Sequence, residues 1–203
     1  MKYVIGIDEV GRGPLAGPVT VCAVLCEKKL YTKLGRDWHL PPLGKDSKKL
    51  SSIQRQTYFM YLNHIGLPYV VVHLSNKQID RLGISMCIKI AIKKSLNKLV
   101  QGMPLDRRAD YAVLLDGGLR APSEFKSQKT IIKGDEKERI IAWASILAKV
   151  SRDRIMTRLH KKYPTYGFGI HKGYGTRMHR QMIAKHGLSA VHRISFCKNC
   201  VRS

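Results

Sequence analysis

The chain has 203 residues, 44% of them hydrophobic, which is enough to bury one sizeable core. Its 37 Lys and Arg against 14 Asp and Glu give a formal net charge of +23, which favours a polyanionic partner such as nucleic acid, although a solvated surface or an anionic membrane face would also account for it. No stretch reaches the ~18 apolar residues of a membrane span, early acids interrupt any secretion signal, and an odd number of cysteines speaks against a disulfide framework. We therefore expect a cytoplasmic protein with no membrane partner.

The predicted elements begin with two neighbouring strands. Residues 2–8 and 19–26 are apolar, β-branched runs, and the Gly- and Pro-rich connection between them, 11–18, suits an adjacent pair. Residues 36–49 contain a Pro-Pro pair and are expected to form a loop.

Helices and strands alternate in the rest of the chain. The long third helix starts with Asp135 and Glu138, a D-x-x-E arrangement that resembles a capping box. Two adjacent strands followed by alternating β and α elements imply an α/β fold, a mixed sheet with helices packed on it. The sequence predicts helices over 51–65, 85–100, 136–162 and 176–186, strands over 69–74, 111–115 and 129–133, and a loop over 167–175.

Acidic residues fall where strands end or helices begin. Asp8 and Glu9 close the first strand, Asp116 closes the fourth, and Asp135 opens the long helix. Clustered carboxylates repel one another unless a cation neutralises them, and Mg²⁺ takes oxygen ligands while keeping waters for a substrate. Two such ions, about 3.5 to 4 Å apart, would activate a water at a phosphate and stabilise the leaving oxygen. Each acid also has a purely structural explanation, as a strand-end, turn or N-cap residue.

Two geometric points limit this hypothesis. Adjacent strand residues point to opposite faces, so Asp8 and Glu9 can serve one centre only if the strand twists or breaks, or if Glu9 uses its main-chain carbonyl. Asp153 lies eighteen residues, or about 27 Å of helix, beyond Asp135. We therefore expect Asp153 to pair with nearby arginines instead.

The C-terminal third is the most basic part of the chain. Residues 145–203 hold thirteen Lys or Arg and one acid, which makes this part the expected phosphate-facing surface. Cys197 and Cys200 form a C-x-x-C pair there. A tetrahedral zinc site needs two further ligands, so an incidental or redox-active pair fits better.

The run GIDEVGRGPLAGPV at residues 6–19 resembles the N-terminal signature of the type 2 ribonuclease H family, ribonuclease HII in bacteria. Trp143 departs from that pattern, since small residues are usual there, and we expect its indole to alter packing behind the acids. The C-x-x-C pair is also outside the pattern. Six further family blocks follow in order: DSKKLS at 46–51, LLDG at 114–117, KGD at 133–135, ASILAKVSRD at 144–153, HKGYGT at 171–176 and HRISF at 192–196.

The resemblance implies an RNase H-like fold, a mixed five-stranded sheet flanked by helices with a C-terminal helical extension. We expect residues 1–203 to form a single catalytic domain, of which about 163–203 is a basic substrate-binding extension. The implied activity, with Mn²⁺ or Mg²⁺, is endonucleolytic hydrolysis of RNA in RNA–DNA hybrids. It includes cutting 5′ of ribonucleotides embedded in duplex DNA, with 3′-hydroxyl and 5′-phosphate products, as in ribonucleotide excision repair. A monomer is expected, and protein partners are not implied.

Roles carry over from the matching motifs. Asp8, Glu9 and Asp116 match the family's metal ligands, and Asp135 matches its fourth catalytic acid. Glycines let the main chain approach a sugar closely, and an arginine fork suits phosphate. The substrate contacts implied are Gly11, Arg12 and Gly13 as the loop that senses the 2′-hydroxyl, Tyr174 as the tyrosine that packs on the next sugar, and Lys48, Lys49, Lys172 and Thr176 as candidate phosphate contacts.

Other interpretations stay open at this level. Without its neighbours, the G-R-G sequence would be a tight turn and Tyr174 a half-buried packing residue. The charge alone would suit a non-catalytic RNA-binding or ribosome-associated protein, which would shift a labelled duplex without cutting it. Ribonuclease HIII carries an extra N-terminal substrate-binding domain, whereas the catalytic motif begins at Gly6 here, and type 1 ribonuclease H lacks the G-R-G loop.

Overall fold

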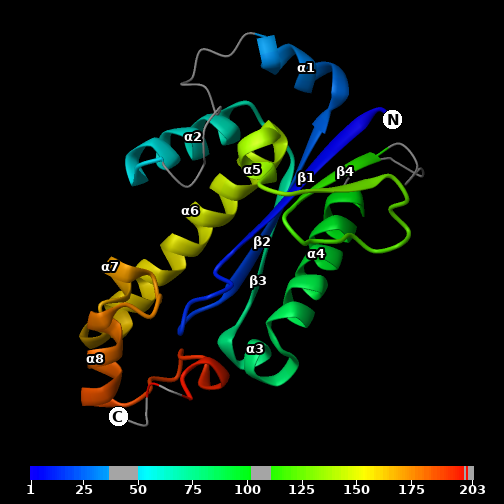
Figure 1. The fold of residues 1–203 in the computed structure, drawn as a ribbon. Helices are drawn as coiled ribbons and strands as arrows, with labels where there is room; N and C mark the ends of the chain where they lie inside the picture. Colours follow the sequence, from blue (N-terminus) through cyan, green and yellow to red (C-terminus); the bar gives the residue numbers. More distant parts are fainter. Residues whose placement is uncertain (37–49, 102–110, 199, 201–203) are drawn as a thin grey trace.

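The chain folds around one mixed five-stranded sheet (Figure 1). The computed structural model describes residues 1–36, 50–101, 111–198 and 200. The strands lie in the order β3-β2-β1-β4-β5, in which β2 is antiparallel to both of its neighbours while β1, β4 and β5 run parallel. Their bounds are β1 Tyr3–Val10, β2 Val19–Glu27, β3 Tyr69–Leu74, β4 Tyr111–Asp116 and β5 Gln128–Ile131.

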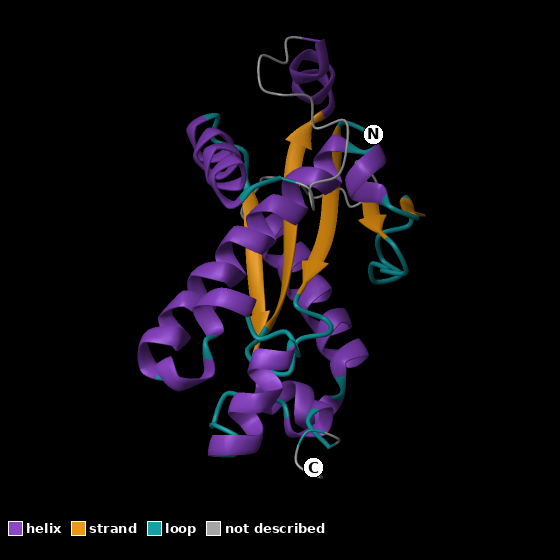
Figure 2. Cartoon of the chain, turned by 60° about the vertical axis from the view of Figure 1, so that its left-hand side comes forward, coloured by secondary structure: helices purple, strands orange, loops and turns teal. Residues whose placement is uncertain are grey.

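Helices cover both faces of this sheet (Figure 1 and Figure 2). The long helix α6 packs on β1 and β2 from one side, and α4 packs on β2 and β3 from the other. The C-terminal elements α7 and α8 gather at the far end of α6. The helices are α1 Lys28–Arg36, α2 Ser52–His64, α3 Asn76–Leu82, α4 Ile84–Gln101, α5 Gly134–Lys137, α6 Arg139–Lys162, α7 Phe168–His171 and α8 Arg177–His186, with 3₁₀ turns at Pro164–Tyr166 and Ile194–Phe196.

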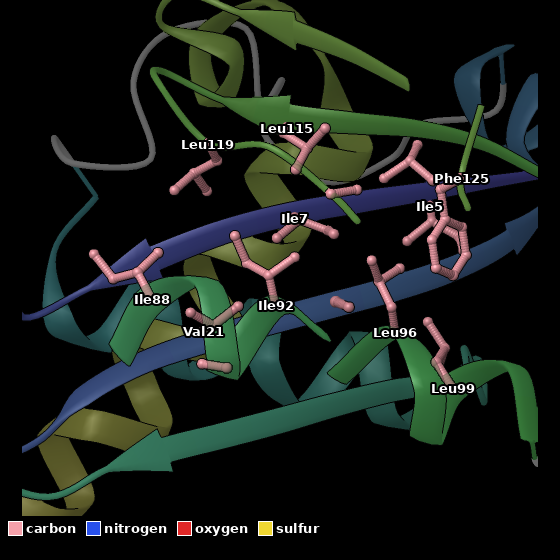
Figure 3. Packing of buried hydrophobic residues seen from close by; sticks show 14 of the residues in the cluster. Ile5, Ile7, Val21, Ile88, Ile92, Leu96, Leu99, Leu115, Leu119 and Phe125 are labelled. Carbon is pink, nitrogen blue, oxygen red and sulfur yellow. The ribbon is translucent and has the colours of Figure 1, made fainter. Parts of the chain in front are cut away.

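The larger core lies between α4 and the sheet (Figure 3). Ile88, Ile92 and Leu96 follow helical spacing and point from α4 toward Ile5 and Ile7 of β1. All five side chains are at most 3% exposed, and each such burial stabilises the fold by about 1.5 to 3 kcal/mol. Since strand residues alternate, the even-numbered residues of β1 face α6.

The second core lies between α6 and the sheet, where the helix approaches β1 very closely. A Cβ on Gly6 would lie 2.3 Å from the carbonyl oxygen of Ile140, so this approach requires glycine. Trp143 is fully buried in the same core, and its ring lies edge-on to Tyr31 of α1 at 5.9 Å. The bulky indole is thus accommodated against α1.

The predicted sheet is confirmed, with every strand bound within two residues of its expected position. Among the predicted helices, 51–65, 85–100 and 176–186 correspond to α2, α4 and α8. The sequence missed α1 and α3, although Ser75 and Gln78 form a capping box at the start of α3. Most of the loop expected over 36–49 lies outside the described residues.

Two predictions along the second half of the chain are wrong. Asp135 and Glu138 do not form a capping box, because Asp116 holds the amide of Gly134 (2.6 Å) and the helical turn begins there, as α5. The chain then turns extended at Glu138 before α6, and neither helix start carries a side-chain cap. The segment 167–175, expected as a loop, contains the helical turn α7.

No helix in the described part of the chain is both long and apolar enough to cross a membrane.

Replacing Gly6 by Ala should lower the free energy of unfolding by about 1 to 3 kcal/mol, because the new methyl group overpacks the contact between β1 and α6. Urea denaturation followed by circular dichroism measures this. Gly118→Ala is the matched control, since a Cβ there meets no atom within 4 Å. Equal stability of the two variants would contradict the close helix–strand contact.

Candidate active site at the end of the first strand

The acids of the first and fourth strands meet in one pocket. β1 pairs with β4 as far as Ile7 and Leu115, so Asp8 and Asp116 are the next residues along two adjacent parallel strands. A pocket of about 450 Å³ lies there, and Asp8, Glu9 and Asp116 all line it. The fold therefore brings three of the four predicted acids to one place.

Asp8 and Glu9 reach this pocket from opposite faces of β1. The alternation of the strand puts Asp8 on the α6 side and Glu9 on the α4 side. Asp8 Oδ1 accepts a hydrogen bond from the amide of Glu9 at 2.7 Å, and Glu9 Oε1 pairs with Arg12 Nη1 at 3.1 Å. Because the pocket lies where the strand ends, both faces border it and the strand does not need to break.

Burial and mutual repulsion make these acids hard to ionise. Burial raises the pKa of Asp8 well above its usual value, the neighbouring charges of Glu9 and Asp116 add to this, and a hydrogen bond from Ser145 opposes it. Burial also raises the pKa of Glu9, with Asp116 adding to the effect and Arg12 opposing it. The pocket therefore favours neutralisation of its carboxylates, by protons or by a cation.

Asp135 is near these acids along the backbone but lies outside the pocket lining. The preceding residue, Gly134, donates its amide hydrogen to Asp116 Oδ1 at 2.6 Å. The Asp135 side chain is 1% exposed and is not among the residues that line the pocket. The hydrogen bond from Gly134 to Asp116 thus fixes the start of α5 at the end of β4. Asp135 is the next residue of α5.

The pocket acids suit a divalent cation by their chemistry, because carboxylate oxygens are the ligands that Mg²⁺ and Mn²⁺ prefer. Each of the three carboxylates is engaged by protein donors or by its neighbours. Over residues 1–36, 50–101, 111–198 and 200, no three His, Cys, Asp or Glu side chains converge as a ready metal site.

The glycine–arginine–glycine loop borders the same pocket, and its two glycines have different surroundings. Gly11 has φ +88°, and a Cβ there would lie 2.3 Å from Nε of Arg152. Gly13 has no such φ, and a Cβ there would meet nothing within 4 Å. The fold itself therefore requires glycine at position 11, whereas it leaves room for a side chain at position 13.

Tyr174 also lines the pocket, as the sequence predicts for a residue that contacts substrate. Its side chain is 41% exposed, and the guanidinium of Arg152 lies 5.9 Å from the ring centroid. Lys48 and Lys49 fall outside the described residues.

The side chains of two other candidate phosphate contacts hydrogen-bond to the main chain, and neither residue lines the pocket. Lys172 adopts a left-handed backbone conformation and donates from Nζ to the carbonyl of Gly169 at 2.7 Å. Thr176 is the N-cap of α8 and accepts a hydrogen bond from the amide of His179 at 3.3 Å.

Sequence reasoning missed the three other polar residues that line the pocket, namely Arg55, Ser145 and Lys149. Ser145 and Lys149 lie one turn apart on α6, inside the block 144–153 that carries the family resemblance, and that block was the available signal. Lys149 Nζ pairs with Asp153 at 2.8 Å. Asp153 is thus an ion-pair residue as expected, but its partner is a lysine.

Three buried histidines support the segment that carries Tyr174. His171 and His179 stack at 4.3 Å, and Nε2 of His179 lies 3.1 Å from Nε2 of His192. The amide of Ser189 donates to Nδ1 of His192, which leaves the His192 proton on Nε2, directed at His179. His179 then carries its proton on Nδ1 and donates to the carbonyl of Tyr174 at 2.9 Å. This network requires neutral imidazoles.

The C-x-x-C pair has the properties of buried structural thiols. Cys197 and Cys200 are free and buried, and burial raises the pKa of Cys197 to about 11. A thiol with so high a pKa is a poor nucleophile. The incidental interpretation therefore fits better than the redox-active one.

Comparison with known proteins places the fold among RNase H-like nucleases. The ribonuclease H2 of Pyrococcus horikoshii OT3 superposes with a TM-score of 0.70 and 27% identity, covering 95% of this chain and 93% of that one. The Ribonuclease HII of Ruminiclostridium cellulolyticum is 43% identical over 201 residues, 98% of this chain and 72% of that protein. That of Caldicellulosiruptor bescii is 38% identical over 198 residues, 98% and 88% of the two.

The sequence model of the family Ribonuclease HII matches residues 5–199. The chain therefore belongs to the ribonuclease HII family. It is a ribonuclease H, an endonuclease that cleaves the RNA of RNA–DNA hybrids.

The three buried histidines should lower the free energy of unfolding as pH drops from about 6.5 toward 4, whereas Asp8 and Glu9, whose pKa values are raised, act in the opposite direction. Burial lowers the pKa of His171 and His192 and lowers that of His179 to about 4, with the charge of Arg180 adding to the effect on His179. An unperturbed histidine titrates near 6.5, so these three histidines bind protons in this pH range in the unfolded chain but stay neutral in the folded chain. Urea midpoints measured between pH 8 and pH 5 give the slope.

His179→Gln is the informative variant, because it removes one of the titrating groups. Its slope below pH 6.5 should be shallower, even if the variant is less stable at pH 8. An unchanged slope would show that the histidine network does not control acid stability.

Proposed function

We propose that this ribonuclease cuts 5′ of ribonucleotides embedded in duplex DNA as well as within RNA–DNA hybrids, leaving 3′-hydroxyl and 5′-phosphate ends. The single observation that carries this proposal is that the strand-end acids and the glycine–arginine–glycine loop line one pocket. A phosphate held beside the acids would put the adjoining ribose against the loop. Such an activity belongs to the removal of ribonucleotides from DNA.

The acids are proposed to hold the catalytic metal ions, with Asp8, Glu9 and Asp116 as ligands and Asp135 as a further catalytic acid. When bound, two Mg²⁺ or Mn²⁺ ions would activate a water and offset charge on the departing 3′-oxygen. The raised pKa values of Asp8 and Glu9 support this, because a divalent cation would favour the carboxylate forms that burial disfavours. If these carboxylates bound an ion, they would give up their present hydrogen bonds, including the one between Glu9 and the guanidinium of Arg12.

The cationic side chains of the pocket are proposed to hold the phosphates. The Arg12 side chain is 56% exposed, and among the described residues it pairs with Glu9 at 3.1 Å, so its fork could turn to a phosphate if that carboxylate held a metal ion instead. Arg55 and Lys149 line the pocket with Arg12. The exposed ring of Tyr174 offers an apolar surface for the sugar on the DNA side of the junction.

The remaining substrate contacts are proposed to come from the basic C-terminal part, about residues 163–203, within a single catalytic domain. This segment packs on the loop through its own apolar cluster, which includes Leu15, Met156 and Phe168. Lys172 and Thr176 belong to it and are proposed to reach phosphates that run past Tyr174. We propose a cytoplasmic monomer.

Asp116→Asn should abolish cleavage while binding of an RNA–DNA hybrid persists. The amide retains an oxygen for the hydrogen bond from Gly134 (2.6 Å in the native protein), so the fold should survive, but it lacks the charge that a metal ligand needs. Cleavage of a labelled hybrid with Mg²⁺ or Mn²⁺ and a gel-shift assay measure the two properties. Turnover in this variant would refute the acid assignment, and a wild-type protein that shifts the hybrid without cutting it would instead be a binding protein.

Gly13→Ala should lower cleavage of a duplex with a single ribonucleotide by about ten- to a hundredfold, because small displacements of a reacting group have effects of this size. The protein tolerates this Cβ, which meets none of its atoms within 4 Å. The matched control is Gly118→Ala, equally open and outside the pocket. Wild-type rates on this duplex and on a uniform hybrid give the reference, and equal activity of Gly13→Ala and Gly118→Ala on the single-ribonucleotide duplex would exclude ribose recognition at Gly13.

A further inference from the structure

Two fully buried arginines lie behind the glycine–arginine–glycine loop. Arg152 comes from α6, and Arg193 follows α8 near the C-terminus; both are 0% exposed. Within the described residues neither forms an ion pair, and main-chain carbonyls accept the hydrogen bonds of both guanidinium groups. Burying a charge without a counter-ion is unfavourable. The arrangement therefore calls for an explanation beyond simple packing.

Arg193 donates hydrogen bonds to the loop close to its glycine–arginine–glycine sequence. Its Nη2 donates to the carbonyl of Gly11 at 2.7 Å, its Nη1 to that of Arg12 at 3.1 Å, and its Nε to that of Gly17 at 2.9 Å. Its own amide donates to the carbonyl of Leu15 at 2.7 Å. One residue thus fixes four carbonyls of a loop that spans residues 11–18.

Arg152 braces the same loop from α6. Its Nε donates to the carbonyl of Pro18 at 2.9 Å and its Nη2 to that of Ala16 at 3.3 Å. Its Nη1 donates to the carbonyl of Lys172 at 3.0 Å, which joins the loop to the segment that carries Tyr174. The guanidinium also occupies the space that a side chain at Gly11 would need.

These bonds decide which way two peptide groups face. In a trans peptide the N–H points opposite to the C=O, and the described residues contain no cis peptide. Arg193 draws the carbonyls of Gly11 and Arg12 toward itself, so the amides of Arg12 and Gly13 point away from it. Neither amide makes a hydrogen bond within the described part of the chain, and both residues line the pocket.

We propose that Arg193, braced by Arg152, is the positioning residue for ribose recognition: it holds the amides of Arg12 and Gly13 as a pair of donors for one 2′-oxygen. Two successive main-chain amides on the same side of a loop can form a concave site for a negative or lone-pair-bearing atom. A cation bonded to the carbonyl of a peptide also polarises its N–H and strengthens the bond that the N–H donates. The inference rests on the proposed function, in which the loop contacts the ribose.

Lysine cannot replace arginine in this task. The guanidinium of Arg193 binds three carbonyls from three separate nitrogens in a rigid fork, whereas an ammonium has a single nitrogen and cannot reproduce that arrangement. Arg193→Lys therefore keeps the net charge, and with it the general attraction for a duplex, while releasing the loop. This separates recognition of one hydroxyl group from electrostatic binding.

The test measures binding in an Asp116→Asn background, so that the duplex is not cut. The measured quantity is the Kd for an all-DNA duplex divided by the Kd for the same duplex with one ribonucleotide. Adding Arg193→Lys should lower this ratio by about tenfold, to near one, while the Kd for the all-DNA duplex stays unchanged. The matched control is Arg81→Lys, an exposed arginine of α3, which should leave both values unchanged. Circular dichroism confirms that each variant is folded at the assay temperature.

The outcomes are distinct. A ratio of one in the Asp116→Asn parent would refute ribose recognition itself, and the inference with it. A parent ratio well above one that persists in folded Arg193→Lys would overturn the role of Arg193 alone, since a purely structural arginine lowers stability without changing this ratio. If Arg193→Lys does not fold, Arg152→Lys takes its place, and an unchanged ratio in that variant would overturn the proposal equally.

Discussion

The close contact between α6 and β1 sets the position of everything in the site. Gly6 allows the helix to come within contact distance of the strand at Ile140, and from there the two elements run side by side in the same direction. The five residues from Gly6 to Gly11 span about 17 Å, and the twelve helical residues from Ile140 to Arg152 span about 18 Å. Because the two lengths match, one contact places a serine hydroxyl beside Asp8, a lysine in the pocket and a guanidinium behind the loop.

The site contains acidic and basic side chains whose charged forms are both disfavoured by burial. Carboxylates with raised pKa values lie on one side of the loop, while burial lowers the pKa of Arg193 to about 9 on the other, with the charge of Arg152 adding to the effect. Main-chain groups hydrogen-bond to Asp8, Asp116 and Arg193, while Glu9 is held by its ion pair with Arg12. Substrate phosphate and divalent cations carry the charges that would relieve this strain, which is the usual relation between a strained site and its ligand.

Much of the fold was accessible from the sequence, because a strand or helix is a local pattern. The apolar β-branched runs marked all five strands, and the acids at the ends of β1 and β4 were correctly expected to meet. The failures came where a distant partner overrides local preference. The capping box at Asp135 does not form, because Asp116 accepts the hydrogen bond of the neighbouring Gly134 amide from 18 residues away in the sequence.

The sequence by itself determined the strands, the acids at their ends and the family, since these depend on residue types at short, ordered spacings. Only the tertiary structure decided how the loop is held and which of its groups remain free. Arg152 and Arg193 lie more than 130 residues along the chain from the carbonyls that they bind in the loop. The sequence around each arginine does not indicate which carbonyls it binds. A hydrogen bond between such distant residues exists only once the sheet and α6 have packed.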